Sequence, residues 1–184
     1  SEVEKLLKEV EDSSRKVEED LRDSNRELKK ILDEVADRIR KSIKRLEDIL
    51  KKVAEDAKRR DKELVEKIIK EVLDDVERVN RENKRILEEV RKRVDEVLRR
   101  NREIVKENEK LLDDVLKEIR DLPVDEKIVR DVERRVRELK ERSRRIVEES
   151  ERSAREIKRE LKRLEDDSSR VVEDIRKKLE ELAK

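Results

Sequence analysis

The chain has 184 residues, of which 59% are charged and 32% are apolar, yet its formal net charge is only +1. It contains no Gly, His, Cys, Met, Phe, Tyr or Trp. These absences exclude the usual zinc, haem and iron–sulfur ligand sets, disulfide bonds, Gly-rich phosphate-binding loops and aromatic platforms for nucleic-acid bases. The composition therefore predicts no enzymatic activity, no cofactor and no metal site.

Positive and negative residues are interspersed along the whole chain, so no basic face would attract nucleic acid or an anionic membrane. No apolar run exceeds two residues, so we expect no transmembrane segment or signal-peptide core. We expect a soluble protein, cytoplasmic when it is expressed recombinantly. No partner is required by these features, although a helical protein partner or self-association stays open.

Apolar residues recur at helical spacing in three stripes of nearly equal length. The stripes run from Val3 to Ala57, from Leu64 to Ile119 and from Ile128 to Leu182. The period of about 3.6 residues in the first stripe is that of a straight α-helix, whereas a strict heptad would give about 3.5. The pattern predicts an all-α fold, an antiparallel three-helix bundle of nearly straight helices of about 58 residues each.

The expected boundaries rest on capping and breaking residues. Ser1 and Glu4 form a capping-box pattern, Asp61 follows a basic run, and Asp125 follows the only proline, Pro123. We expect one bundle over residues 1–184, with helices over about 2–58, 62–120 and 126–183. The first break lacks Gly and Pro, so one helix over residues 2–120 is the alternative, and a domain-swapped dimer could form on it.

Apolar doublets widen the stripes, as packing in a three-helix bundle requires. At each doublet the stripe passes through one member and leaves the other beside it. The members placed in the stripes are Leu7, Ile68, Leu111 and Val171, and their neighbours are Leu6, Ile69, Leu112 and Val172.

Most Ser and Asn residues stand where an apolar stripe should continue. They are either surface fillers and weak spots in the core, or members of buried hydrogen-bond networks. Counted from the expected turns, they form three layers. Ser42, Asn80 and Ser168 share one height, with Asn83 within a turn, and Ser13, Ser14 and Asn108 share another, with Ser143 one turn away. Ser24, Asn25, Asn101 and Ser150 cluster in a third layer, offset by about a turn. Because buried polar groups are unfavourable unless paired, matched heights predict networks that set register and partner choice.

Three acidic doublets are the candidates for binding a hard cation: Asp74–Asp75, Asp113–Asp114 and Asp166–Asp167. Many Lys and Arg residues surround them, and no loop carries the Gly that a calcium-binding loop needs at its sharp turn. We therefore interpret these doublets as solvated surface carboxylates.

The aliphatic stripes, the Ser and Asn layers, the charged surface and the strings Asp12-Ser13-Ser14-Arg15 and Asp167-Ser168-Ser169-Arg170 resemble computationally designed de novo helical bundles with buried hydrogen-bond networks. The resemblance covers the whole chain and is one of style. It implies a designed structural scaffold, a stable monomeric helical rod with no natural biochemical function. The alternative is a designed helical interaction module (a heterodimer, switch component or domain-swapped homodimer) whose polar networks set pairing specificity.

Overall fold

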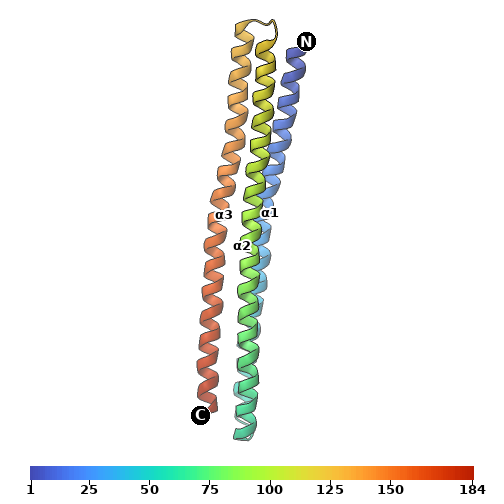
Figure 1. Cartoon of the computed structure of the whole chain (residues 1–184). Coiled ribbons are helices and arrows are strands. Elements are labelled where there is room, and N and C mark those ends of the chain that lie inside the picture. Colours follow the sequence, from blue (N-terminus) through green and yellow to red (C-terminus); the bar gives the residue numbers. More distant parts are fainter. The chain divides into compact units, whose positions relative to one another are not determined.

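A computed structural model describes residues 1–184. Its three α-helices are α1 (Glu2–Ala57), α2 (Lys62–Asp121) and α3 (Glu126–Ala183), and the chain has no strand (Figure 1). None of the helices contains a stretch that is long and apolar enough to cross a membrane. The predicted fold class, a bundle of three long helices, is confirmed.

The first break is a tight turn without glycine. After α1 ends at Ala57, the Lys58 and Arg59 amides donate to the Glu55 and Asp56 carbonyls at 3.3 and 3.0 Å, so the last turn is closed by short-range bonds. The cations of this turn also suit the negative end of the helix dipole. The alternative of one continuous helix over residues 2–120 is therefore wrong.

The other helix ends follow from the residues that stand there. The Ser1 hydroxyl accepts a hydrogen bond from the Glu4 amide at 3.3 Å, which caps α1. Pro123 cannot continue a helix because its nitrogen carries no hydrogen. In this loop the Val124 amide donates to the Leu122 carbonyl at 2.8 Å, and α3 begins directly after Asp125.

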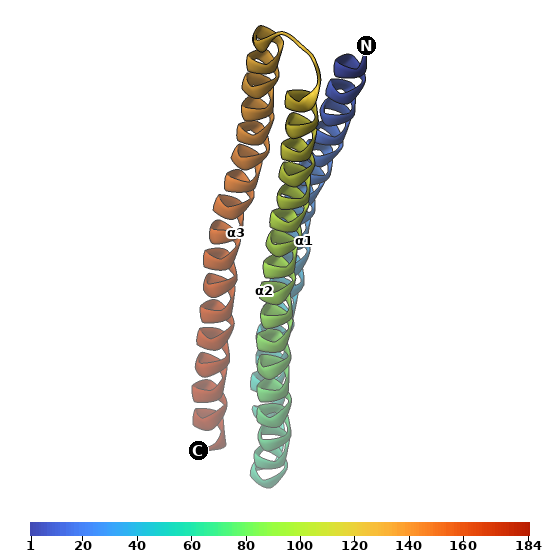
Figure 2. The same cartoon turned by 45° about the horizontal axis from the view of Figure 1, so that its top comes forward.

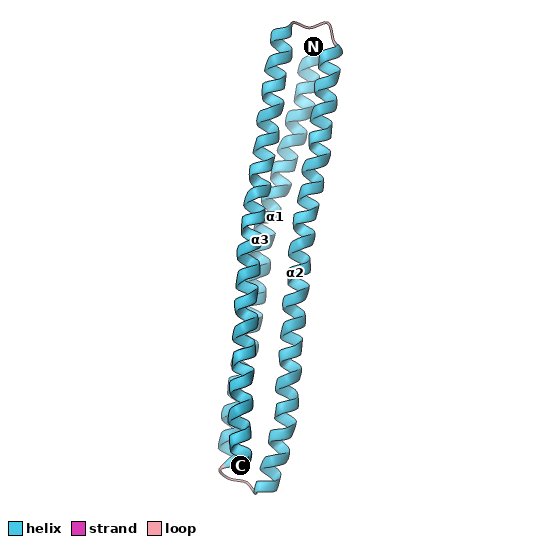
Figure 3. Ribbon diagram, turned by 60° about the vertical axis from the view of Figure 1, so that its left-hand side comes forward, coloured by secondary structure: helices cyan, strands magenta, loops and turns pink.

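The chain divides into two compact units, each made of one segment from every helix. Unit 1 comprises Ser1–Lys29 and Val94–Glu156, and unit 2 comprises Lys30–Arg93 and Ile157–Lys184. In unit 1 the α2–α3 loop and the N-terminus lie at the same end (Figure 2). In unit 2 the C-terminus lies near the turn between α1 and α2 (Figure 3). That residues 1–184 form a single domain stays a prediction.

Contacts between side chains give the helix directions within unit 1. α1 and α3 run parallel, because paired residues keep a sequence separation of 124 or 125. α2 and α3 run antiparallel, because the separation of paired residues grows from 13 at Arg120–Glu133 to 49 at Arg102–Glu151. In each unit, one buried aliphatic cluster contains residues of all three helices.

The apolar clusters at the centre of both units consist of aliphatic side chains. One cluster in unit 1 contains Leu6, Val10, Leu112, Val115, Ile119, Val132, Val136 and Leu139. The cluster in unit 2 contains Leu46, Val53, Val65, Ile69, Val76, Val172, Ile175 and Leu179. Burial of one Leu or Ile side chain contributes about 1.5–3 kcal/mol, so these clusters are the main source of stability.

At four apolar doublets the sequence stripe passed through the less buried member. The structure leaves Leu7, Ile68, Leu111 and Val171 half-buried and buries their neighbours. The buried members are Leu6, Ile69, Leu112 and Val172, none of them more than 8% exposed. Adjacent residues lie about 100° apart around a helix and flank the same seam, so helical spacing cannot distinguish them.

Truncation of a core leucine tests this account. Leu112 is fully buried, so Leu112→Ala is expected to lower the free energy of unfolding by about 2–5 kcal/mol through lost burial and a residual cavity. Leu64 is 41% exposed, and Leu64→Ala is the control, with an expected change within about 0.5 kcal/mol. Guanidinium denaturation measures both; equal losses would contradict the assignment of the core.

Candidate functional site

The polar layer of unit 2 is a continuous chain of hydrogen bonds that joins all three helices. The Ser42 hydroxyl donates to Asn83 Oδ1 at 3.2 Å, and Asn83 Nδ2 donates to Ser168 Oγ at 3.2 Å. The Ser168 hydroxyl then donates to Asn80 Oδ1 at 3.4 Å. Asn83 and Ser168 are buried, and each both donates and accepts, so this layer leaves neither of them unpaired.

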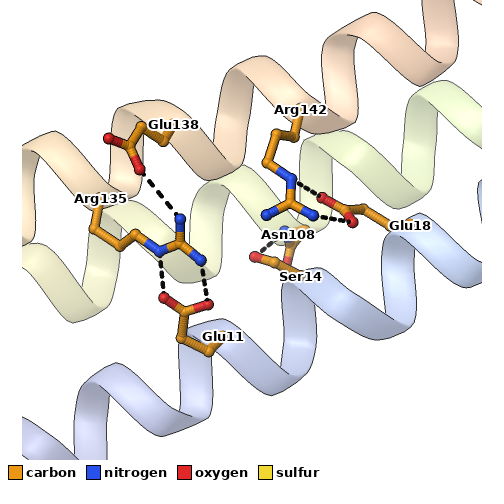
Figure 4. A network of polar contacts seen from close by, with 7 residues as sticks. All are labelled: Glu11, Ser14, Glu18, Asn108, Arg135, Glu138 and Arg142. Carbon is orange, nitrogen blue, oxygen red and sulfur yellow. Dashed lines mark hydrogen bonds and ion pairs between the residues drawn. The ribbon is translucent and has the colours of Figure 1, made fainter.

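One polar layer of unit 1 joins α1 to α2. The Ser13 hydroxyl donates to Asn108 Oδ1 at 2.6 Å. Asn108 Nδ2 donates to Ser14 Oγ at 3.2 Å, a contact that Figure 4 shows. Ser143 of α3 was expected a turn away from these residues. It is only 1% exposed, yet its Oγ has no hydrogen-bond partner.

The other layer of unit 1 joins all three helices through Ser150. Asn101 Nδ2 donates to Ser150 Oγ at 3.5 Å, and the Ser150 hydroxyl contacts Asn25 Oδ1. The same hydroxyl lies 3.1 Å from the Ile146 carbonyl oxygen, and its single proton serves one of these acceptors at a time. Asn101 Oδ1 is buried without a partner. Ser24 is buried but forms no hydrogen bond with this layer.

The structure thus brings the expected polar residues together, with the exception of Ser24 and Ser143. It also makes Asn83, which was expected within a turn of the first layer, the central link of that layer. These contacts establish buried Ser and Asn hydrogen bonds. Their role in specifying helix pairing stays a prediction.

Sequence reasoning missed a cluster of charged residues between α1 and α3 in unit 1. Glu18 is only 4% exposed; Arg142 Nη2 donates to its Oε2 at 3.0 Å, and Arg142 Nε lies 2.9 Å from its Oε1. Seven residues earlier on both helices, Arg135 binds both carboxylate oxygens of Glu11, with the Nη2 contact at 2.8 Å. Figure 4 shows both pairs beside the Ser14–Asn108 contact. Glu11 and Glu18 are seven residues apart, as are Arg135 and Arg142, and this shared spacing could have indicated the two pairs from the sequence.

Hydrogen bonding shifts the protonation of the Glu11–Arg135 pair. The hydrogen bonds from Arg135 hold the pKa of the Glu11 carboxyl below its ordinary value of 4.5. The carboxylate in turn raises the pKa of the Arg135 guanidinium, because the charged form is favoured beside an opposite charge. Both groups therefore stay ionised over the neutral pH range.

Four further ion pairs join α2 to α3 in unit 1, and we name them the charge ladder. They are Arg120–Glu133 at 2.9 Å, Asp113–Lys140, Glu109–Arg144 at 2.8 Å and Arg102–Glu151 at 3.4 Å. From Arg102 to Arg120, the four ladder residues of α2 are positive, negative, negative and positive. Each of their partners on α3 carries the opposite charge. The Glu109 carboxylate raises the pKa of the Arg144 guanidinium through its hydrogen bond.

A groove of about 390 Å³ lies between α2 and α3 of unit 1. Its lining includes Val105 and Val147, together with charged side chains that include two of the ladder pairs. No group of three or more carboxylates is placed to hold a metal ion, and Asp113 of one acidic doublet is paired with Lys140 instead. The groove thus offers a small aliphatic patch surrounded by charged side chains, four of which already form the pairs Arg102–Glu151 and Glu109–Arg144.

The fold and its polar layers define the class of protein, an all-α three-helix bundle with buried hydrogen bonds. No protein-family model matches the chain, and no curated protein matches it. Among solved structures it is similar to one described as a computationally designed three helix bundle, with a TM-score of 0.54 and 20% sequence identity. The similarity covers 99% of this chain and 89% of that chain. At this identity the similarity establishes the shared fold, which agrees with the resemblance to designed bundles.

Two buried serines of α3 allow a matched test of the polar layers. Ser168 and Ser143 are each 1% exposed, but only Ser168 has hydrogen-bond partners. Ser168→Ala leaves Asn83 and Asn80 with unpaired polar atoms, so it is expected to lower the free energy of unfolding by about 1–3 kcal/mol. Ser143→Ala removes an unpaired hydroxyl and is expected to be neutral or stabilising. Chemical denaturation measures both, and equal losses would argue against the layer in unit 2.

The Glu11–Arg135 pair predicts a pH-dependent stability. Because the folded-state pKa of Glu11 is lowered, its contribution is present above pH 4.5 and is lost as the pH falls through the lowered value. Glu11→Gln is expected to be less stable than the parent at pH 7, by less than about 1 kcal/mol because the pair is partly solvated, and the difference should disappear as the pH falls below the lowered pKa of Glu11. Glu9→Gln, on the exposed side of the same turn, is the control. A difference independent of pH would refute this reasoning.

Proposed function

We propose that the chain is a designed structural scaffold, a self-contained monomeric helical bundle whose buried Ser and Asn layers fix how its helices pair. The observation that carries the proposal is the hydrogen-bond chain in unit 2, which runs from Ser42 through Asn83 and Ser168 to Asn80. The proposal includes no catalytic step, no cofactor and no obligatory partner.

Polar layers restrict pairing in a way that an aliphatic seam does not. Val, Leu and Ile side chains pack against one another in many arrangements at similar free energy, so an all-aliphatic seam tolerates exchange of helices. A buried Asn that loses its partners destabilises an arrangement by about 1–3 kcal/mol. An arrangement that matches every Asn with its Ser is therefore favoured over its competitors.

The burial of apolar surface favours a self-contained bundle over an interaction module. Leu64 and Ile128 are the only large aliphatic side chains that are exposed, and each stands near the beginning of a helix. The remaining large aliphatic side chains are buried or half-buried. A module that awaits another chain would present a continuous aliphatic stripe to solvent.

The mass of the particle in solution tests the proposal. Light scattering after size exclusion is expected to give the mass of one chain, 22.3 kDa, across a wide range of protein concentrations. A particle of two chains would contradict the monomeric scaffold. It would favour the interaction module, with the same layers pairing helices of different chains.

The role of the layers is tested by making them aliphatic. The variant Ser42→Val, Asn80→Leu, Asn83→Leu, Ser168→Val removes both sides of each hydrogen bond. It is therefore expected to remain helical and to lose less stability than Ser168→Ala. Its mass distribution is expected to broaden to include two-chain species, because the layer no longer disfavours exchange. Ser153→Val, Ser169→Val is the control, since these half-buried serines lie outside the layers. A single sharp mass for the aliphatic variant would show that the layer does not set pairing.

A further inference from the structure

The two polar layers of unit 1 discriminate poorly against one particular error, a slip of α3 along α2 by seven residues. Asn101 and Asn108 are seven residues apart on α2, and Ser143 and Ser150 are seven residues apart on α3. Since Asn101 bonds Ser150 and the helices are antiparallel, such a slip would bring Asn108 to Ser150 or Asn101 to Ser143. Seven residues are nearly two helical turns, so the aliphatic faces would still meet.

The charge ladder, unlike the polar layers, opposes a slip of seven residues because the slip would bring like charges together. A slip in one direction would place Glu109 opposite Glu151 and Arg120 opposite Lys140. A slip in the other direction would place Arg102 opposite Arg144 and Asp113 opposite Glu133. Each follows from the ladder pairs, because Arg102 and Glu109 are seven residues apart on α2, as are Asp113 and Arg120. The first slip replaces two attractive pairs by repulsive ones. The second slip does the same but also brings Glu109 to Arg137 and Arg120 to Glu126, so the ladder opposes the first slip more strongly.

The ion pairs between α1 and α3 lack this property. Glu11 and Glu18 carry one sign, and Arg135 and Arg142 carry the other. A slip of seven residues in one direction would pair Glu11 with Arg142 and preserve an attraction. The mixed signs of the ladder distinguish it from these pairs.

The ladder charges are also partly removed from water. In each pair one of the two side chains is no more than 35% exposed. Charges in such positions interact more strongly than fully solvated ones and are less screened by salt. Repulsion between such charges would therefore destabilise the slipped register.

We propose that the charge ladder selects the register of α3 against α2 in unit 1, where a seven-residue slip would still match one Asn of α2 with one Ser of α3. The inference rests on the proposed function, because it assigns part of the pairing specificity to residues outside the layers. Arg102, Glu109, Asp113 and Arg120 of α2 are the specificity-determining residues on that helix.

A charge-neutral exchange within the ladder is the test. Glu109→Arg, Arg120→Glu makes two native ladder pairs repulsive and makes the slipped pairs with Glu151 and Lys140 attractive, while every layer residue is kept. The chain has no Cys, so Lys117→Cys and Glu149→Cys place two nitroxide labels at exposed sites. In the native register the labelled sites are about 20 Å apart along the helix axis, and the slip would reduce this to about 9 Å.

Pulsed electron paramagnetic resonance reads the register directly. We expect one distance for the parent and a second distance, shorter by up to about 10 Å, for the ladder variant. Adding Glu133→Arg and Arg144→Glu restores opposite charges in the native register and is expected to restore the single distance. Arg99→Glu, Glu103→Arg is the matched control, because it exchanges the same charges on α2 at exposed positions outside the ladder.

A single, unchanged distance in the folded ladder variant would overturn the proposal, even if its stability fell. If this double variant does not fold by circular dichroism, Glu109→Arg alone is measured with the same labels and judged by the same criterion. Light scattering on each sample separates the two proposals. A one-chain mass with an unchanged distance refutes the ladder and leaves the scaffold standing, whereas a two-chain mass for the parent refutes the scaffold.

Discussion

Burial of aliphatic side chains along one face of each helix is the interaction on which the rest of this structure depends. Charged residues make up 59% of the chain and no aromatic residue is present, so Val, Leu, Ile and Ala supply all of the apolar packing. A helix satisfies its own backbone hydrogen bonds, so the helices need only cover their apolar faces. Three long helices achieve this with a low apolar fraction, because each presents a narrow face and leaves the remainder to water.

The polar side chains add specificity to helix pairing that aliphatic burial already stabilises. The Ser and Asn layers are buried, directional and short-ranged, and they penalise any arrangement that separates a donor from its acceptor. The ion pairs are longer-ranged and partly solvated, so individually they add little stability. Their arrangement of signs nevertheless distinguishes one register from another. Stability and specificity thus reside in different residues of the same bundle.

The two units differ in how completely their buried polar atoms are hydrogen-bonded. Asn101 Oδ1 and Ser143 Oγ are buried without hydrogen-bond partners, and Glu18 Oε1 is buried with only its ion-pair contact to Arg142 Nε; all three atoms belong to unit 1. The Asn and Ser residues of unit 2, by contrast, are linked in one chain. Unit 1 also contains the charge ladder and the two Glu–Arg pairs between α1 and α3. The unit whose hydrogen-bond layers are less complete therefore carries the denser set of ion pairs between helices.

The sequence by itself determined the helical segments and the residues that interrupt the apolar stripes, because helical periodicity and the absence of helix breakers are local properties. It left open whether residues 2–120 form one helix or two, since no Gly or Pro marks the first break, and the structure decided for two. Matching heights across the turns also placed Ser14 with Asn108 in one layer and Ser42 with Ser168 in another. Only the tertiary structure decided which member of each apolar doublet is buried, that Asn83 is the central link of its layer, and that Ser143 stays unpaired. It also decided that Glu18 is a buried carboxylate and that the ladder charges meet in one register. These outcomes depend on the rotation of each helix about its axis and on rotamers within bonding distance, and spacing along the chain specifies neither.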